Sequence, residues 1–287
     1  MAISVSLKTI VEKVAKSLGC MKEGSISVVT NAKTFTIPRF KDYFPSDKGP
    51  EDWFLWCNGE WHRVNTWDGN LGVLVTIDDF IAVPLLGDAV QLYRILEPDD
   101  WRDAANYALT SLWFEDRITT ALSDGKNLYT LSATTWLQTK QQLIRFLWRD
   151  VSGGATYIEE PSVAFLRPIE EDNSLSVYIP ILPADITNTR LITVAKHYYE
   201  ALTSEGAMTT CPEPLFLAAT KFECLLRIFQ KMPTKAKADY GRDLILTERD
   251  LAKQKAQYVP EATFEDMREE EPWKMVDMGY IPTLWTW

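Results

Sequence analysis

The stretch DDWRDAANYALTSLWFEDRITTALSDGKNLYTLS, residues 99–132, decides the fold because it joins a helical pattern directly to a strand pattern. Its first part repeats apolar residues at intervals of three and four, which is typical of an amphipathic helix. These residues are Trp101, Ala104, Ala105, Ala108, Leu109, Leu112 and Trp113. Either leading aspartate suits the N-cap. We therefore expect a core helix over 98–116, then a strand, a turn at Asp124-Gly125 and a second strand.

On the N-terminal side, residues 26–97 contain short β-rich runs such as TFTIP, DWFLWCNG, EWHRVNTW and AVQLYRIL. Asn58-Gly59 separates two of these runs, and Asn-Gly is a strong hairpin signal. We expect a small barrel or sandwich of about five or six strands in this region. Before it, residues 6–18 place apolar side chains on one helical face and Gly19 follows, so we expect a helix within 1–25 that joins the helical core.

On the C-terminal side, residues 117–184 return to β signals and predict a second antiparallel sheet. Three further segments have apolar residues at helical spacing and predict a helical bundle over 185–257. They are residues 187–203, 214–232 and 234–257. Residues 258–287 contain prolines and an acidic cluster without a sustained period, which predicts an extended arm. The predicted fold class is therefore α+β: a helical bundle core, two antiparallel β modules (a small barrel insertion and a second β-sheet) and an extended C-terminal arm.

Composition argues against several classes of protein. The chain of 287 residues has a formal net charge of −10, whereas tight nucleic-acid binding needs clustered lysine and arginine. Its apolar runs fall short of the roughly 20 residues of a membrane span, and its first residues lack the apolar region of a signal peptide. We therefore expect a protein made in a cytoplasm, without membrane contact. Four cysteines outside any C-x-x-C pair predict reduced thiols.

The sequence offers few candidates for catalysis. It contains neither a phosphate-binding G-x-x-x-x-G-K-[ST] loop nor a G-x-G-x-x-G motif. His62 lies within a tryptophan-rich strand and His197 within a predicted helix, where packed or surface roles are usual. Carboxylate doublets such as Asp78-Asp79 point to opposite faces of a strand and rarely converge. We expect no enzyme activity, no metal site and no cofactor.

Four tryptophans of the first β module leave two interpretations open. Trp53, Trp56, Trp61 and Trp67 could form a sugar-binding platform, or they could fill the core of the barrel. The first interpretation would make the protein a carbohydrate-binding module for host interaction. Their mixed spacing favours the core.

The order of these elements resembles the head-to-tail connector, or adaptor (neck), proteins of tailed bacteriophages. The resemblance rests on three features: the helix from Trp101 to Trp113, the run from Asp124-Gly125 to Tyr129 and Leu131, and the strand SLSVYIPILP (174–183) before the predicted helix at 187. It implies a structural virion protein of the neck, without an active site. Such proteins form homo-oligomeric rings, commonly of about twelve copies. The ring joins the portal protein to the next tail or neck component and extends the DNA channel, through which DNA passes without specific binding.

The resemblance also implies that the C-terminal arm grips the portal. The aromatic and aliphatic residues that would bind the portal or a neighbouring subunit are Trp273, Tyr280, Ile281, Leu284, Trp285 and Trp287. An arm that folds back on its own domain is the alternative. Another tail-completion or baseplate-type virion protein is the alternative function closest to the adaptor.

Overall fold

The computed structural model describes residues 4–44, 49–123, 125–131, 137, 142–151, 157–159, 165–168, 175–179, 181–232 and 237–258. Tertiary contacts divide the chain into two compact units. The first combines the residues up to Thr110 with Glu200–Gln254, and the second contains Ser111–Tyr199 together with the residues from Lys255. The first unit is therefore built from two segments that are distant in the sequence.

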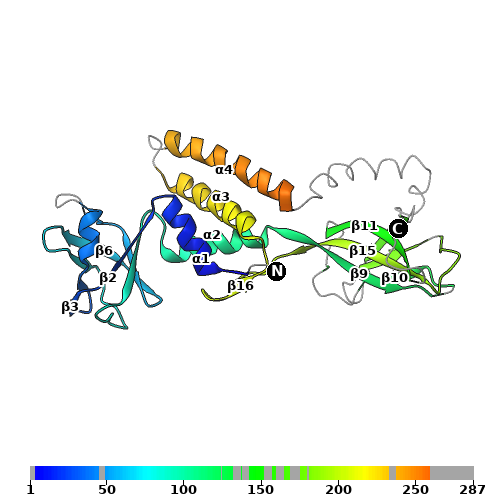
Figure 1. Ribbon diagram of the computed structural model, residues 1–287, viewed down its shortest axis with the longest axis horizontal. Coiled ribbons are helices and arrows are strands. Elements are labelled where there is room, and N and C mark those ends of the chain that lie inside the picture. The colour runs from blue at the N-terminus through cyan, green and yellow to red at the C-terminus, as the bar shows by residue number, and fades with distance from the viewer. Residues whose placement is uncertain are drawn as a thin grey trace. The chain divides into compact units, whose positions relative to one another are not determined.

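Helices make up one part of the first unit. They are α1 (Leu7–Ser17), α2 (Pro98–Thr110), α3 (Glu213–Lys231) and α4 (Lys237–Tyr258). Helices α1, α2 and α3 pack against one another, and Figure 1 shows α3 lying over α1 and α2. Alanines on the buried face of α2 allow this close approach. Within the described chain, no helix is both long and apolar enough to cross a bilayer.

The ends of α1 and α2 follow from local chemistry. Ser6 caps α1, because its Oγ accepts a hydrogen bond from Thr9 N at 3.2 Å. Gly19 follows α1 with φ at +67°, a conformation that glycine adopts without strain. Helix α2 begins at Pro98, so the two aspartates considered as N-caps lie in its first turn instead. There their negative charges interact favourably with the positive end of the helix dipole. The predicted helix is confirmed, although it ends at Thr110.

The first β module is a seven-stranded antiparallel sheet with the order β2-β8-β5-β6-β7-β4-β3. Its strands are β2 (Met21–Ser25), β3 (Val28–Asn31), β4 (Thr34–Thr36), β5 (Phe54–Cys57), β6 (Glu60–Asp68), β7 (Val73–Thr76) and β8 (Ala89–Tyr93). A short 3-10 helix, η1 (Pro38–Asp42), covers β2. The end strands β2 and β3 are consecutive in the chain, so the sheet must curl back on itself. The Asn58-Gly59 hairpin is confirmed, with φ of 52° and 89°.

The second unit contains a four-stranded antiparallel sheet with the order β12-β11-β15-β9 and a three-stranded sheet with the order β10-β14-β13. Their strands are β9 (Trp113–Ala121), β10 (Leu128–Thr130), β11 (Leu143–Asp150), β12 (Tyr157–Glu159), β13 (Phe165–Pro168), β14 (Leu175–Tyr178) and β15 (Thr189–Tyr198). Side chains flanking both sheets, including Ile118, Tyr129 and Leu191, share one buried cluster. A separate pair, β1 (Val5–Ser6) and β16 (Met208–Thr209), lies in the first unit.

The prediction of a helical bundle core is wrong. Residues 187–203 were expected to be a helix, but they contain the strand β15, which pairs with β9 on one side and β11 on the other. In both β modules, sheets enclose a large buried cluster. Among the described residues, the helices that pack against one another are α1, α2 and α3, and all three belong to the first unit. The α+β description fits only in the broad sense that helices and strands both contribute.

Candidate functional site

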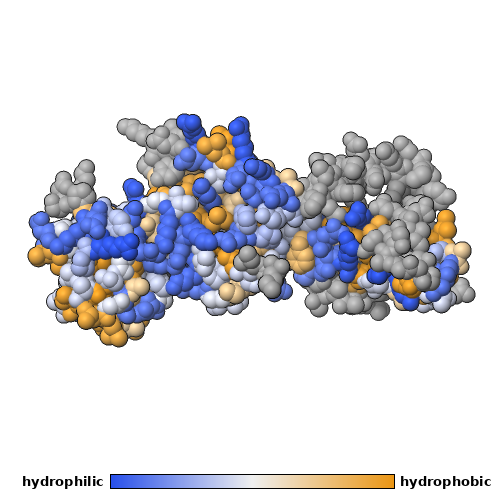
Figure 2. Space-filling view, viewed as in Figure 1, coloured by the Kyte–Doolittle hydropathy of each residue, from blue (hydrophilic) through white to orange (hydrophobic). Residues whose placement is uncertain are grey.

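Residues 77–88, which connect β7 to β8, present aliphatic side chains to solvent. Ile81 is 94% exposed, Leu86 72% and Leu85 69%, and Val83 is exposed as well. Apolar surface on the first β module is visible in Figure 2. Such surface is costly to leave in water, and where it is contiguous it marks sites of protein interaction. We refer to these residues as the 77–88 loop.

The 77–88 loop is fixed from inside by Phe80. This ring is buried, meets Phe35 edge-to-face at a centroid distance of 5.5 Å, and meets His62 at 4.5 Å. Phe80 N donates to Ala32 O at 2.9 Å, so the backbone is held at the same point. The loop therefore buries one large ring while its neighbour Ile81 faces outward.

Glu60 holds the backbone next to Ile81. Its carboxylate accepts hydrogen bonds from Ile81 N at 2.9 and 3.1 Å and from Ala82 N at 3.3 Å. His62 Nε2 lies 2.7 Å from Glu60 Oε1. Burial raises the pKa of Glu60, but the hydrogen bonds from Ile81, His62 and Ala82 outweigh it and hold the pKa below its ordinary value. These hydrogen bonds therefore favour the ionised carboxylate.

A second carboxylate holds the far end of the loop. Asp88 Oδ2 accepts from Leu85 N at 2.8 Å and from Asn58 Nδ2 at 2.7 Å. Gly87 N donates to Ile26 O at 2.9 Å, and its φ of +89° requires glycine. The loop is therefore preorganised, with exposed apolar side chains on a fixed backbone, which lowers the entropy lost when a partner binds.

No protein-family model matches the sequence, and no curated protein matches it.

The arm residues predicted to bind a partner lie outside the described residues. They are Trp273, Tyr280, Ile281, Leu284, Trp285 and Trp287. The same holds for Asp124 of the predicted turn, whereas Gly125 is described and has φ at +68°. The assignment of the arm therefore remains a prediction.

The four tryptophans of the first β module do not share one open face. Trp53 and Trp67 pack against the buried cluster of the curled sheet, and Trp53 meets Phe44 edge-to-face at 5.1 Å. Trp56 is buried beside α1, where Lys8 Nζ lies 5.4 Å from its ring centroid. The rings of Trp61 and Phe54 pack edge-to-face, with their centroids 5.4 Å apart. Packing uses these rings, which leaves no flat platform of the kind that stacks on a sugar.

Both histidines have structural neighbours. His62 contacts Glu60 and Phe80, as described above. His197 Nδ1 lies 3.1 Å from Asp116 Oδ2, and its ring stacks on Phe114 at 4.9 Å. Among the described residues, no group of three or more histidine, cysteine, aspartate or glutamate side chains could hold a metal ion.

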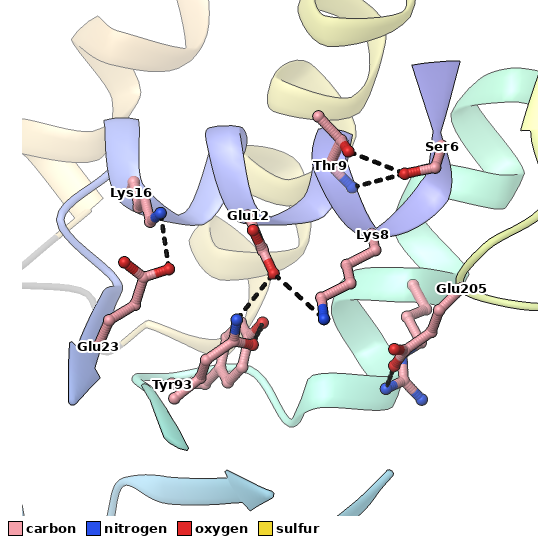
Figure 3. Close-up of polar contacts among 10 residues, drawn as sticks. Ser6, Lys8, Thr9, Glu12, Lys16, Glu23, Tyr93 and Glu205 are labelled. Atoms are coloured by element: carbon pink, nitrogen blue, oxygen red, sulfur yellow. Dashed lines mark hydrogen bonds and ion pairs between the residues drawn. The ribbon is translucent and has the colours of Figure 1, made fainter. Parts of the chain in front are cut away.

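A polar network surrounds α1 (Figure 3). Some of its members, with Trp56, line a small cavity. Glu12 accepts from Gln91 Nε2 at 2.8 Å and lies 4.0 Å from Lys8 Nζ. Burial, and next the nearby Glu12, raise the pKa of Tyr93 far above its usual range, so its hydroxyl donates to Gln91 Oε1 at 2.8 Å. The cavity measures about 10 Å³, which leaves room for no more than one water. The network joins α1 to β8 and is not a ligand site.

Sequence reasoning gave the 77–88 loop no functional role and missed it as a surface. A signal was present in IDDFIAVPLLGD, because an apolar run without strand alternation stands between acidic residues. Apolar residues in a connection are usually anchors. Only the structure separates the anchor Phe80 from the outward residues Ile81, Leu85 and Leu86.

Proposed function

We propose that this protein is a structural virion protein, a head-to-tail adaptor of a tailed bacteriophage. Copies of the chain form a ring that joins the portal to the next tail component and extends the DNA channel. The observation that carries the proposal is the preorganised 77–88 loop. It offers exposed aliphatic side chains on a fixed backbone, which suits repeated protein contacts rather than chemistry on a small molecule.

The resemblance in element order supports the same proposal in part. Helix α2 is followed after two residues by β9, in the order that the resemblance is based on. The segment after SLSVYIPILP departs from it, because β15 stands where a helix was expected. The net charge of −10 suits a channel wall that DNA passes without binding, since like charges disfavour contact with phosphates.

The carbohydrate-binding alternative loses its main support. That function needs aromatic faces open to a sugar, and the candidate rings are engaged with Phe44, Phe54 and Lys8. We therefore retain the adaptor as the proposed function and the arm as its portal anchor.

A portal-binding experiment tests the proposal. The full chain and a chain ending at Tyr258 are each mixed with the matching portal ring, and binding is measured by sedimentation. The full chain is expected to bind, while the shortened chain stays folded by circular dichroism and loses most binding. A full-length Trp285→Ala/Trp287→Ala variant serves as the matched control and should lose about 100-fold in affinity, as expected for aromatic anchors. A full chain that does not bind the portal would overturn the adaptor function, and equal binding by the full and shortened chains would overturn the arm assignment.

A further inference from the structure

A cleft on the first unit lies between α4 and the rest of the helices. It has a volume of about 540 Å³, within the range of about 300–1,000 Å³ that holds a ligand or a group of side chains. Leu18, Leu225 and Leu246 give it apolar walls, and Lys221 and Asp243 line it with one charge of each sign. It is the larger of the two cavities described here.

The outer face of α4 continues this cleft with a basic and apolar stripe. Arg242, Ile245, Leu246, Arg249 and Lys253 follow one another at helical spacing, so they share one face. Ile245 is 53% exposed and Leu246 51%. Among the described residues, no hydrogen bond or ion pair engages Arg242, Arg249 or Lys253.

The inner face of α4 is already occupied. Thr247 is buried, and Leu244 and Leu251, one turn to either side of it, are half-buried. Residues at 244, 247 and 251 thus face the body of the unit. The outer stripe is therefore not needed to hold α4 in place.

The 77–88 loop has the complementary character. Its aliphatic side chains are preceded by Asp78 and Asp79, which are exposed. The Asp79 carboxylate forms a long ion pair with Lys33, with Oδ1 4.0 Å from Nζ, and its side chain remains 67% exposed. The loop is acidic and apolar, whereas the stripe is basic and apolar and the cleft beside it carries one charge of each sign, so opposite charges of loop and stripe would flank a common apolar centre.

We propose that the 77–88 loop of one copy seats in the cleft beside α4 of a second copy. The occupant is thus another copy of this chain, and the inference rests on the proposed ring. Ile81, Leu85 and Leu86 enter the cleft against Leu246, while Asp78 and Asp79 face Arg242 and Arg249 of the stripe.

Such a contact is heterologous, because it joins two different surfaces of the same chain. Each copy still presents a free loop on one side and a free cleft on the other after one contact forms. Repetition of the contact closes a ring where the rotation between copies permits. An isologous contact, in which the loop meets a second loop, would stop at a dimer.

Cysteine crosslinking of the full chain tests the contact. Ala82→Cys lies on the loop and Ala252→Cys lies on the same face of α4 as Ile245, two turns further along, and both alanines are exposed. Burial raises the pKa of Cys20 and of Cys57 to about 11, and all four native cysteines are buried, so the native thiols stay silent at neutral pH. Ala201→Cys, at another exposed alanine of the first unit, is the matched control.

The expected result is a crosslinked dimer when the Ala82→Cys and Ala252→Cys chains are mixed and treated with a short bismaleimide. Either chain alone should give a yield of crosslinked dimer no higher than that of the Ala201→Cys control. A chain carrying both cysteines should give a ladder of larger oligomers. Asp78→Lys/Asp79→Lys in the loop copy should lower the yield about tenfold, and Arg242→Asp/Arg249→Asp in the other copy should restore it.

Several outcomes would overturn the contact. Dimers from Ala82→Cys alone would indicate a loop-to-loop interface, and a yield at the control level in the mixture would show that the two surfaces do not meet. The portal experiment separates this failure from that of the adaptor function. If the chain binds the portal but the crosslink does not form, only the proposed contact is wrong. If the ladder of oligomers forms but the chain does not bind the portal, the adaptor function is wrong and the contact stands.

Discussion

At the residue scale, Glu60 determines whether the 77–88 loop keeps its shape. Its carboxylate accepts hydrogen bonds from the backbone N–H groups of Ile81 and Ala82 and contacts the ring of His62. Three groups therefore depend on one side chain. Charged acceptors make stronger hydrogen bonds than neutral ones. The side chain is 22% exposed, which limits the gain through solvent screening. A partner that needs Ile81 in a fixed position depends on this carboxylate.

Glu60→Gln should loosen the loop without unfolding the sheet. The variant keeps one carbonyl acceptor but loses the charge, and we expect a cost of about 1 kcal/mol in unfolding free energy. Hydrogen exchange at the amides of Ile81 and Ala82 should accelerate, while exchange within β5 stays unchanged. Unchanged exchange at both loop amides would contradict the role given to Glu60.

The same carboxylate predicts a dependence on pH. Its pKa is lower in the folded protein than the ordinary value of 4.5, so its contribution to stability is present above that value and is lost as the pH falls through the folded pKa. Wild-type amide exchange at Ile81, corrected for intrinsic rate, should therefore accelerate below about pH 4.5. Glu60→Gln should remove this pH dependence, and its persistence in the variant would assign the effect to another group.

Thiol labelling provides a second prediction at this scale. Burial raises the pKa of Cys20 and of Cys57 to about 11, so at pH 8 only about one thiol in a thousand would be ionised even if reagent could reach it. Labelling by an aromatic disulfide should be slow in the folded protein at pH 8 and complete in denaturant. Fast labelling of Cys20 or Cys57 in the folded chain would contradict their burial.

At the scale of elements, the sequence predicted the helices better than the strands of the second unit. Helices α1, α2 and α3 each bury one face, so their apolar residues recur at helical intervals. Strand β15 buries residues on both faces, because a cluster lies on each side of its sheet. A continuous apolar run does not distinguish a helix from a buried strand. The β-branched residues Ile192, Thr193 and Val194 were the signal that favoured a strand.

The candidate site was less predictable than the fold. Asn58-Gly59 marks its hairpin from local chemistry alone. The contacts from Glu60 to Ile81 and from Asn58 to Asp88 join residues far apart in the chain, and no local pattern encodes them. The predicted arm lies outside the described residues, so its role stays a prediction.

Gly24 in β2 tests the packing of η1 against the first β module. A Cβ at this position would lie 2.6 Å from Ile37 Cγ2 and 2.9 Å from a carbon of the Phe40 ring, which is too close for either. Gly24→Ala should therefore destabilise the protein by about 1–3 kcal/mol through overpacking. Gly206→Ala is the matched control, because a Cβ there would meet nothing within 4 Å. Urea unfolding of both variants would check this, and equal midpoints would contradict the close approach.

At the scale of the whole molecule, residues 111–199 are inserted between the two segments of the first unit. The chain leaves the first unit after α2 and returns at Glu200, and Tyr199 N donates to Leu112 O at 3.1 Å where the two strands meet. Asn106 then fixes the returning chain through two hydrogen bonds with the backbone of Leu202, at 2.9 and 3.0 Å. Because the ends of the insertion lie side by side, the first unit does not need the second to close its chain.

Replacing residues 113–198 with a short Gly-Ser linker should therefore leave the first unit folded. The linker spans only the distance between paired strands, so its closure costs little entropy. Circular dichroism should retain the signal of the four helices, and urea unfolding should remain cooperative. Asn106→Ala in the shortened chain should lower the unfolding free energy by about 1–3 kcal/mol, because it leaves the Leu202 backbone unsatisfied. A shortened chain that is unfolded under conditions where the full chain is folded would show that the first unit depends on the insertion.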